Sequence, residues 1–401
     1  MSGGRRADWR ALLPLVLATV ATQASIVVLA PVVVAIGRDL GASFTAVGVA
    51  RSILAATAVA VSLAIGPVID RVGVRPLIVG GALLALAGAG LTAAAPSLAS
   101  FYAAHVVTGA GVACLLSAGF AGVAAYFPVG RTAWAVGWVV GAQSLAWIAG
   151  NPIVGLLAEG GSWRLAYIVP AAISGLALAA GLLALPQPIG ETDSESGARN
   201  GLGAVVRDRS ARRWSLAELV AYSAWTAELT YAGAFYIESY GLGEAEVGVL
   251  LSVGSVVFLI ASTNSRHLAE RFARKPLIVG SALVMGALLV PILNLSPSVW
   301  FTAGLFCVVA LFASLRSTAA STLGLAQMPG RPGAMMASRT ASAQLGYMIG
   351  AAGGGAVIAL GGFGALGFAV CGGMALSAWL VMRVSDPQAE PGPLVPEPVP
   401  D

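Results

Sequence analysis

The chain has 401 residues, of which 58% are hydrophobic and only 10% are charged, with a formal net charge of +4. An ordinary soluble domain carries about 25% charged residues, so this composition excludes a chain that folds mainly in water. Three scattered cysteines and two histidines give no spacing for a disulfide framework or a zinc site, and we expect neither a metal nor a cofactor.

Apolar runs of eighteen or more residues recur along the chain, as is typical of transmembrane helices. The first run follows MSGGRRADWR and is too long for a signal peptide, so we keep it as the first span. We therefore expect an all-α, multi-pass membrane protein with twelve transmembrane helices. The expected spans are residues 11–36, 45–67, 77–95, 99–126, 134–158, 165–185, 214–237, 247–264, 276–293, 299–325, 335–358 and 364–382.

Lysine and arginine indicate the orientation of these spans. With the N-terminus in the cytoplasm, eighteen basic residues fall on the cytoplasmic side and only Arg38 and Arg164 on the opposite side. Basic residues are enriched in cytoplasmic loops, and an even number of spans places both termini on the same side. We predict a protein of the bacterial cytoplasmic membrane with both termini in the cytoplasm. The basic excess then reflects topology and not a nucleic-acid partner.

One long polar interruption divides the twelve spans into six and six. We expect an N-terminal six-helix bundle at residues 1–185, a cytoplasmic linker at 186–213 and a C-terminal six-helix bundle at 214–383. Residues 384–401 are rich in proline and acidic residues, which is typical of a disordered tail.

The two halves repeat each other at an offset of 200 residues. DRVGVRPLIVG at residues 70–80 returns as ERFARKPLIVG at 270–280, and Gly41 and Gly150 return as Gly241 and Gly350. Because each half has an even number of spans, the halves are parallel repeats related by an axis along the membrane normal. Two such pseudo-symmetric bundles leave a cavity between them at mid-membrane.

The segment GPVIDRVGVR resembles the cytoplasmic loop signature of the major facilitator superfamily, G-x-x-x-D-R-x-G-R-R/K, and the resemblance extends over essentially the whole chain. Val74 departs from the signature where an arginine is usual. The resemblance implies a drug/proton antiporter-like transporter in which two bundles rock around a central site. It also implies that the acidic residue binds across to the other half, the alternative being a solvated loop carboxylate. The positions assigned to gating here are Gly66, Asp70, Arg71, Gly73 and Arg75.

A tight turn between two spans needs the backbone freedom of Gly73. The basic residues hold the loop at the cytoplasmic face.

Charged side chains inside the spans are candidate functional groups, because each costs about 2.5 to 3.5 kcal/mol at mid-span unless it lines a cavity or is paired. Glu228 lies near the middle of the seventh span and Arg316 past the middle of the tenth. Either Glu228 binds the coupling proton or pairs with substrate, or it forms a fixed ion pair with Arg316. Arg51, two turns into the second span, either reaches the outer surface or attracts an anionic substrate group.

The fourth span resembles a family pattern, l-x-x-x-R-x-x-q-G-x-G-x-A, in which a buried arginine serves proton coupling. His105 takes the place of that arginine and Thr108 the place of the glutamine. Histidine titrates near neutrality, so proton coupling through His105 stays open beside a packing role.

The fifth span resembles the antiporter signature g-x-x-x-G-P-x-x-G-G only in part, which weakens the case for efflux. Asn151 stands where a glycine is usual before Pro152. Glycine and proline would still allow this helix to pack closely and to bend during transport. We therefore assign conformational gating to Gly150, Asn151, Pro152 and Gly155.

Polar and aromatic side chains at comparable depth in the two halves are expected to contact substrate, with polar bonding between helices as the alternative. Together with Arg51 and Arg316, the predicted substrate-binding residues are Gln23, Gln143, Trp147, Tyr222, Trp225, Gln344 and Tyr347.

These features predict a secondary transporter that works by alternating access, since the chain has no nucleotide-binding motif and a proton crossing the membrane can supply the driving energy. We expect proton-coupled efflux of amphipathic compounds by a monomer whose partners are a small-molecule substrate, protons and the lipid bilayer. Uptake or exchange of a small organic anion is the alternative. A non-transporting membrane sensor is a second alternative, and an enzyme is not expected because no nucleophile–base pair stands out.

Overall fold

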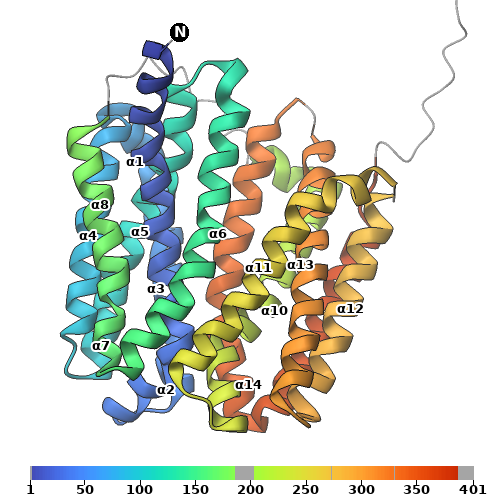
Figure 1. The fold of residues 1–401 in the computed structure, drawn as a ribbon. Helices are drawn as coiled ribbons and strands as arrows, with labels where there is room; N and C mark the ends of the chain where they lie inside the picture. The colour runs from blue at the N-terminus through green and yellow to red at the C-terminus, as the bar shows by residue number, and fades with distance from the viewer. Residues whose placement is uncertain (1, 186–202, 272, 329, 387–401) are drawn as a thin grey trace, which may run out of the picture.

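A computed structural model describes residues 2–185, 203–271, 273–328 and 330–386, and every regular element in these ranges is an α-helix (Figure 1). The expected tail from residue 387 onward and the expected linker up to residue 202 lie outside the described residues. The helices are α1 (Ser2–Val27), α2 (Leu29–Asp39), α3 (Phe44–Val72), α4 (Val74–Ala93), α5 (Leu98–Tyr126), α6 (Val129–Glu159), α7 (Trp163–Ala166), α8 (Ile168–Leu183), α10 (Arg209–Tyr240), α11 (Glu244–Arg271), α12 (Arg274–Asn294), α13 (Val299–Gln327) and α14 (Pro332–Met382).

Within the described ranges, ten helices are long and apolar enough to cross a membrane, which makes the chain a multi-pass membrane protein. The sequence predicts twelve, and the difference lies in α10 and α14. Helix α10 has 32 residues but a more polar composition. Helix α14 runs for 51 residues and contains two of the expected spans.

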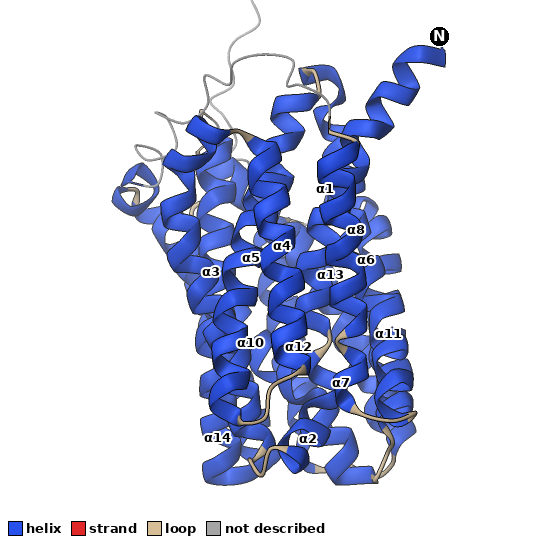
Figure 2. Cartoon of the chain, turned by 90° about the vertical axis from the view of Figure 1, so that its left-hand side faces the viewer, coloured by secondary structure: helices blue, strands red, loops and turns tan. Residues whose placement is uncertain are grey.

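Gly362 separates the two expected spans inside α14. Its dihedral angles, φ 70° and ψ −173°, are not helical and belong to a region that only glycine adopts without strain. A straight helix of this length would be about 77 Å long, more than twice the roughly 30 Å of the hydrocarbon core. The interruption lets the chain turn back at the end of the bundle where α2 and α7 lie (Figure 2).

The first expected span is also divided, into α1 and α2. Pro31 stands in the first turn of α2 and has no N–H to donate to the carbonyl of Val27, four residues earlier. The helical hydrogen bonding is therefore interrupted at Val28, which keeps helical dihedral angles.

The two halves are built alike, as the 200-residue repeat predicts. Helices α3 and α11 begin at residues 44 and 244, α4 and α12 at 74 and 274, and α5 and α13 at 98 and 299. Gly41 and Gly241 both adopt left-handed backbone, with φ of 64° and 68°. The same turn thus precedes α3 and α11.

The buried apolar residues form three clusters that show how the halves meet. One cluster belongs to the N-terminal half alone and includes Leu12 and Leu115. Another belongs to the C-terminal half alone and includes Trp214. The third contains residues of both halves, such as Ile36 and Phe235. The halves therefore share one core toward the end of the bundle opposite the N-terminus, which we call the outer end (Figures 1 and 2).

Candidate functional site

A cavity of about 310 Å³ lies between the two halves. This volume is at the lower end of the range for small-molecule sites. Helices α1, α2, α3 and α6 line it from the N-terminal half, and α10, α11, α12, α13 and α14 from the C-terminal half. Eight of the nine predicted substrate-binding residues line this cavity, namely Gln23, Arg51, Gln143, Trp147, Tyr222, Trp225, Arg316 and Tyr347. The ninth, Gln344, is half-buried on α14 outside the cavity lining.

Polar side chains of α1 and α6 form a connected wall on the N-terminal side. The amide of Gln23 donates to the side-chain oxygen of Gln143 at 3.3 Å, and the indole N–H of Trp147 donates to the side-chain oxygen of Gln23 at 3.0 Å. Gln143 and Trp147 stand four residues apart and so share one face of α6. The bonds hold these three side chains at the cavity and join α1 to α6.

Arg51 is a buried cation on this side. Its residue is 8% exposed, and its guanidinium carbon lies 5.4 Å from the centre of the Tyr347 ring, on α14 of the other half. Its Nε has no hydrogen-bond partner, and no carboxylate of the described chain forms an ion pair with it. The alternative in which Arg51 reaches the outer surface is wrong, because the side chain is buried at the cavity.

Arg316 is paired with Glu218 and not with Glu228. Its guanidinium lies 2.5 Å from Oε1 of Glu218, and Arg339 approaches Oε2 of the same carboxylate at 3.4 Å. The expected pair fails for a geometric reason. Glu218 and Glu228 are ten residues apart on α10, which separates them by about 15 Å along the axis and turns them to different faces.

Aromatic rings continue this charged cluster toward Arg51. The guanidinium of Arg339 lies 5.7 Å from the centre of the Tyr222 ring, and Tyr222 meets Tyr347 edge to face at 5.7 Å. These contacts form a row of side chains that begins at Arg51 in the N-terminal half and continues through the C-terminal half. The row is Arg51, Tyr347, Tyr222 and Arg339. Guanidinium groups beside aromatic faces are favourable and stay oriented there.

Glu228 lies in a second, much smaller chamber beside the cavity. The chamber has a volume of about 10 Å³, and Phe306 lines both spaces. The residue is 5% exposed, and its Oε2 has no partner. The chamber's other lining residues are the phenols Tyr231 and Tyr236 and the apolar residues Ala232, Phe235, Ile292, Leu293, Phe363 and Leu366. The structure thus buries the carboxyl group next to the cavity between the halves and not inside it.

His105 lies away from the cavity lining. The residue is 3% exposed, its Nδ1 donates to the carbonyl oxygen of Phe101 at 2.8 Å, and the two rings are 4.5 Å apart. A bond to the preceding turn of its own helix and a ring contact are what a packing histidine makes. The expected proton-coupling role of His105 has no contact to the cavity to support it.

The charged loop between α3 and α4 has the glycine conformation that the sequence predicts. Gly73 adopts φ 79° and ψ 177°, outside the range of residues with a side chain. Arg75 donates to the carbonyl oxygens of Gly181 and Leu182 at 3.2 and 2.6 Å, so it fastens α4 to the end of α8. Gly66, Asp70 and Arg71 lie in α3 before the turn, and the side chains of the last two are outside the described part of the chain.

The glycines assigned to gating on α6 allow close contacts both within and between the halves. A Cβ on Gly150 would lie 2.9 Å from Val27 of α1, in the same half. A Cβ on Gly155 would collide with the main chain of Glu244 at the start of α11, in the other half. From the other side, a Cβ on Gly248 would collide with the carbonyl of Asn151. Asn151 is buried and lines the cavity, with its amide donating to the Trp147 carbonyl at 2.9 Å.

Two serines join the halves by bonds related through the repeat. Ser52 donates to the carbonyl oxygen of Met348 at 2.7 Å, and Ser252 donates to that of Ile148 at 2.5 Å. Both donors and both acceptors are separated by 200 residues. Pro152 has no N–H for the carbonyl of Ile148, so Ser252 occupies an acceptor that the helix leaves free. Neither serine stands out in the sequence, although the repeat register relates them.

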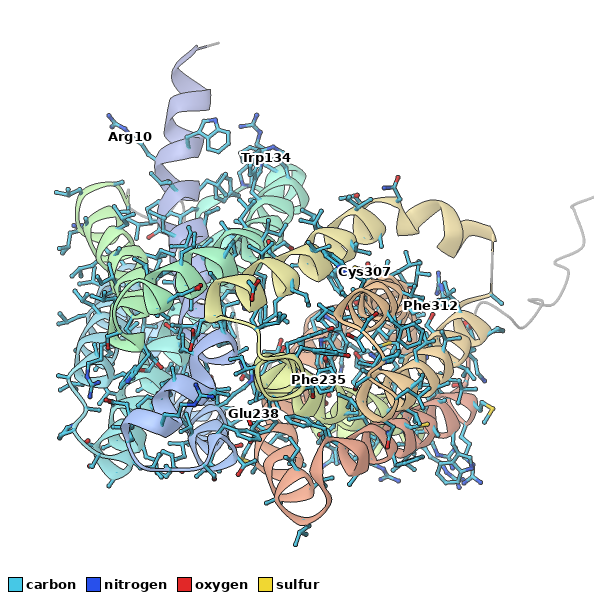
Figure 3. All side chains as sticks on the ribbon, turned by 60° about the horizontal axis from the view of Figure 1, so that its bottom comes forward. Arg10, Trp134, Phe235, Glu238, Cys307 and Phe312 are labelled. Atoms are coloured by element: carbon cyan, nitrogen blue, oxygen red, sulfur yellow. The ribbon has the colours of Figure 1, made fainter. Side chains whose placement is uncertain are left out.

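Polar contacts also close the outer end between the halves. Arg38 lies 3.8 Å from Glu238, which Figure 3 shows beside α2. The carboxylate of Glu159, at the end of α6, accepts from the backbone N–H of Ala245 at 3.1 Å. The phenol of Tyr231 donates to the carbonyl oxygen of Ala351 on α14 at 2.8 Å and lies 3.3 Å from that of Thr45 on α3. Together with the shared apolar core, these contacts hold the cavity closed on this side.

Comparison with known proteins gives one family match and many similar folds. A sequence model of the Major Facilitator Superfamily matches residues 15–262 and 214–401. The crystal structure of the D-xylose-proton symporter has a TM-score of 0.74 and 15% identity, and covers 94% of this chain and 98% of that one. A mutant of the nucleoside transporter NupG has a TM-score of 0.75 and 12% identity, and covers 93% and 99%. At such identities the likeness shows the fold alone. No curated protein sequence matches the chain.

Proposed function

The chain belongs to the Major Facilitator Superfamily and is a membrane transporter, and from this premise we propose proton-coupled efflux of an amphipathic small molecule by alternating access. The observation that carries the proposal is the cavity between the halves, which both halves line and which the outer contacts close. We place both termini in the cytoplasm of a bacterial cell and take the protein to act as a monomer. In this arrangement we take the structure as a state closed toward the outside, because the contacts between the halves at the outer end are made.

Transport in this proposal consists of a relative rotation of the two halves. Opening the outer end requires α6 to separate from α11, and α3 from α14, which breaks the serine bonds and the Arg38–Glu238 contact. These bonds are few and individually weak, since a neutral hydrogen bond contributes about 0.5 to 1.5 kcal/mol. A closure held by several such bonds can be reversed during each cycle.

We assign the coupling proton to Glu228. A carboxylate without a partner is costly to bury, whereas a carboxylic acid is not. Glu228 has tyrosine hydroxyls and apolar groups around it, and no cation of the described chain is paired with it. Phe306 separates it from the substrate cavity, so the presence of substrate at this ring can influence access to the carboxyl group.

Uptake or exchange of a small organic anion is the second candidate. The observation that favours it is Arg51, a buried cation that lines the cavity without an ion-pair partner in the described part of the chain.

Flux measurements in proteoliposomes test the proposed function. A panel of aromatic cations, neutral compounds and acids would be followed by mass spectrometry under an imposed pH gradient, with a pH-sensitive dye reporting proton movement. We expect flux that depends on the gradient in the wild type and loses this dependence in Glu228→Gln. The exposed Glu246→Gln serves as the matched control. Flux that does not depend on the pH gradient in any variant, the wild type included, would exclude proton coupling. The absence of any flux would favour a membrane sensor that does not transport.

A further inference from the structure

We propose that the cavity binds an amphipathic organic acid, with its carboxylate at Arg51 and its apolar body against the aromatic lining. The inference rests on the proposed transport function and names its substrate class. It follows from three features of the cavity, which are an unpaired buried cation, the sign of the remaining charge, and the side chains that surround the space.

Arg51 has the properties of a binding group for a carboxylate. A buried guanidinium without an anionic partner is unfavourable, and it persists at functional sites where a ligand supplies that partner. The planar guanidinium matches a carboxylate through two parallel hydrogen bonds, which makes the pair both strong and oriented. The Nε of Arg51 is one of the donors without a partner. The guanidinium carbon lies over the Tyr347 ring, and this cation–π contact helps to hold the group at the cavity.

The charge on the C-terminal side favours the same ligand. Arg316 and Arg339 share the single carboxylate of Glu218, so one positive charge remains in this cluster. Among the lining residues that the structure describes there is no aspartate or glutamate. A cationic compound would meet two uncompensated positive charges and no partner, which disfavours it by desolvation and repulsion. Since Arg316 already holds Glu218, the free partner for an anion is Arg51.

The rest of the cavity suits a small apolar body. Trp147, Trp225, Phe258 and Phe306 present aromatic surface from α6, α10, α11 and α13. Ring faces and edges stabilise an aromatic group by about 0.5 to 1.5 kcal/mol beyond the burial of its area. The volume of about 310 Å³ fits a compound with one ring system more readily than a large polycyclic drug.

The position of Arg51 also connects binding to the rotation of the halves. Arg51 belongs to α3, and the ring beneath it belongs to α14, which packs against α3 across the boundary between the halves. An anion at Arg51 would neutralise a charge at this boundary. Substrate would therefore change the energy of the contact that moves during transport.

Binding measurements in detergent micelles test the substrate class without requiring flux. Two series of probes carry the same body with different charge: 4-phenylbutyrate, its amide and 4-phenylbutylamine, and indole-3-propionate with its amide and the corresponding amine. We expect both carboxylates to bind about 10- to 100-fold more tightly than their amides, as for hydrogen bonds to a charged group, and the amines not to bind. Arg51→Gln should bring the carboxylates to the level of the amides, and Arg51→Lys should give intermediate affinity. The exposed Arg207→Gln should equal the wild type.

Several outcomes would overturn the inference: binding by neither carboxylate, an amide or amine that binds as tightly as its acid, or an acid preference that survives in Arg51→Gln. Misfolding does not confuse the test, because Arg51→Gln removes an unpaired buried charge and its amide binding reports an intact cavity. If the acid preference is absent while gradient-driven flux of another compound is found, the substrate class is wrong and the transport function stands. If acids bind but no flux is found, the substrate class stands and the transport function is wrong.

Discussion

Removing the carboxylate of Glu218 should strongly destabilise the C-terminal half. Glu218 is 1% exposed, and it is paired with Arg316 and Arg339. In Glu218→Gln both guanidinium groups would lose their anionic partner, and that of Arg316 is only 7% exposed. Loss of one partner of a buried ion pair costs about 3 to 5 kcal/mol, because the remaining charge is left without compensation.

The two arginines do not contribute equally to this figure. The side chain of Arg316 is 7% exposed and lies 2.5 Å from the carboxylate, whereas that of Arg339 is 22% exposed and lies 3.4 Å away. Arg339 also keeps its bond to Ser317 and its position over the Tyr222 ring. We therefore attribute most of the loss to Arg316 and expect about 3 kcal/mol or more in the free energy of unfolding.

Reversible unfolding by SDS in mixed micelles, followed by circular dichroism, would measure this loss. Glu246→Gln, an exposed carboxylate of the same half, should change the free energy by less than about 0.5 kcal/mol. The double variant Glu218→Gln/Arg316→Gln should recover part of the stability, with a coupling energy of about 1 to 3 kcal/mol. A loss below about 1 kcal/mol in Glu218→Gln, or strictly additive effects in the double variant, would refute the reasoning.

Three further changes test other parts of the structure. Ser52→Ala and Ser252→Ala each remove one hydrogen bond between the halves. Both variants should increase the rate at which a cysteine in the cavity is labelled from the outside, by up to about tenfold if the bond contributes about 1.4 kcal/mol. An effect in only one of the two variants would contradict the equivalence of the two bonds. Gly248→Leu should prevent the close approach of α11 to α6 and should also increase the rate of cysteine labelling from the outside. An unchanged labelling rate would contradict the role of this contact in closing the outer end. Hydrogen bonds from Arg164 and then Trp163 lower the pKa of Asp39 from 3.8, so its contribution to stability is full above that pH and is lost as the pH falls through the lowered value. Asp39→Asn should thus be less stable than the wild type at pH 7 and nearly equal to it near pH 2, and a constant difference in melting temperature would show that the contact does not titrate.

Many residues of the cavity lining could be predicted from the sequence, because polar side chains inside a membrane span avoid contact with lipid. Gln23, Gln143 and Arg51 would be costly in contact with lipid, so each had to face either the cavity or a neighbouring helix. The repeat likewise predicts paired elements, and the equal turns at Gly41 and Gly241 confirm its register. Such inferences depend on depth and helix face alone, which the sequence contains.

Pairing between helices could not be predicted in the same way. Glu218 and Glu228 stand on one helix, and which of them meets Arg316 depends on how α13 is rotated and shifted against α10. The separate chamber of Glu228 depends on where Phe306 divides the space. The span count differs for another reason: α14 contains two of the expected spans, divided at Gly362, and the polar residues of α10 keep it from the count of apolar helices.

Distances between spin labels at both ends of the bundle test the central claim, that the two halves rock around the cavity. One pair would be Gly160→Cys with Leu295→Cys at the outer end, and the other Leu183→Cys with Met382→Cys at the opposite end, in a chain whose three cysteines are replaced by serine. Pulsed electron resonance in liposomes would compare pH 8 with pH 5. The account predicts that the two distances change in opposite directions. Two unchanged distances, or a change of the same sign in both, would contradict it.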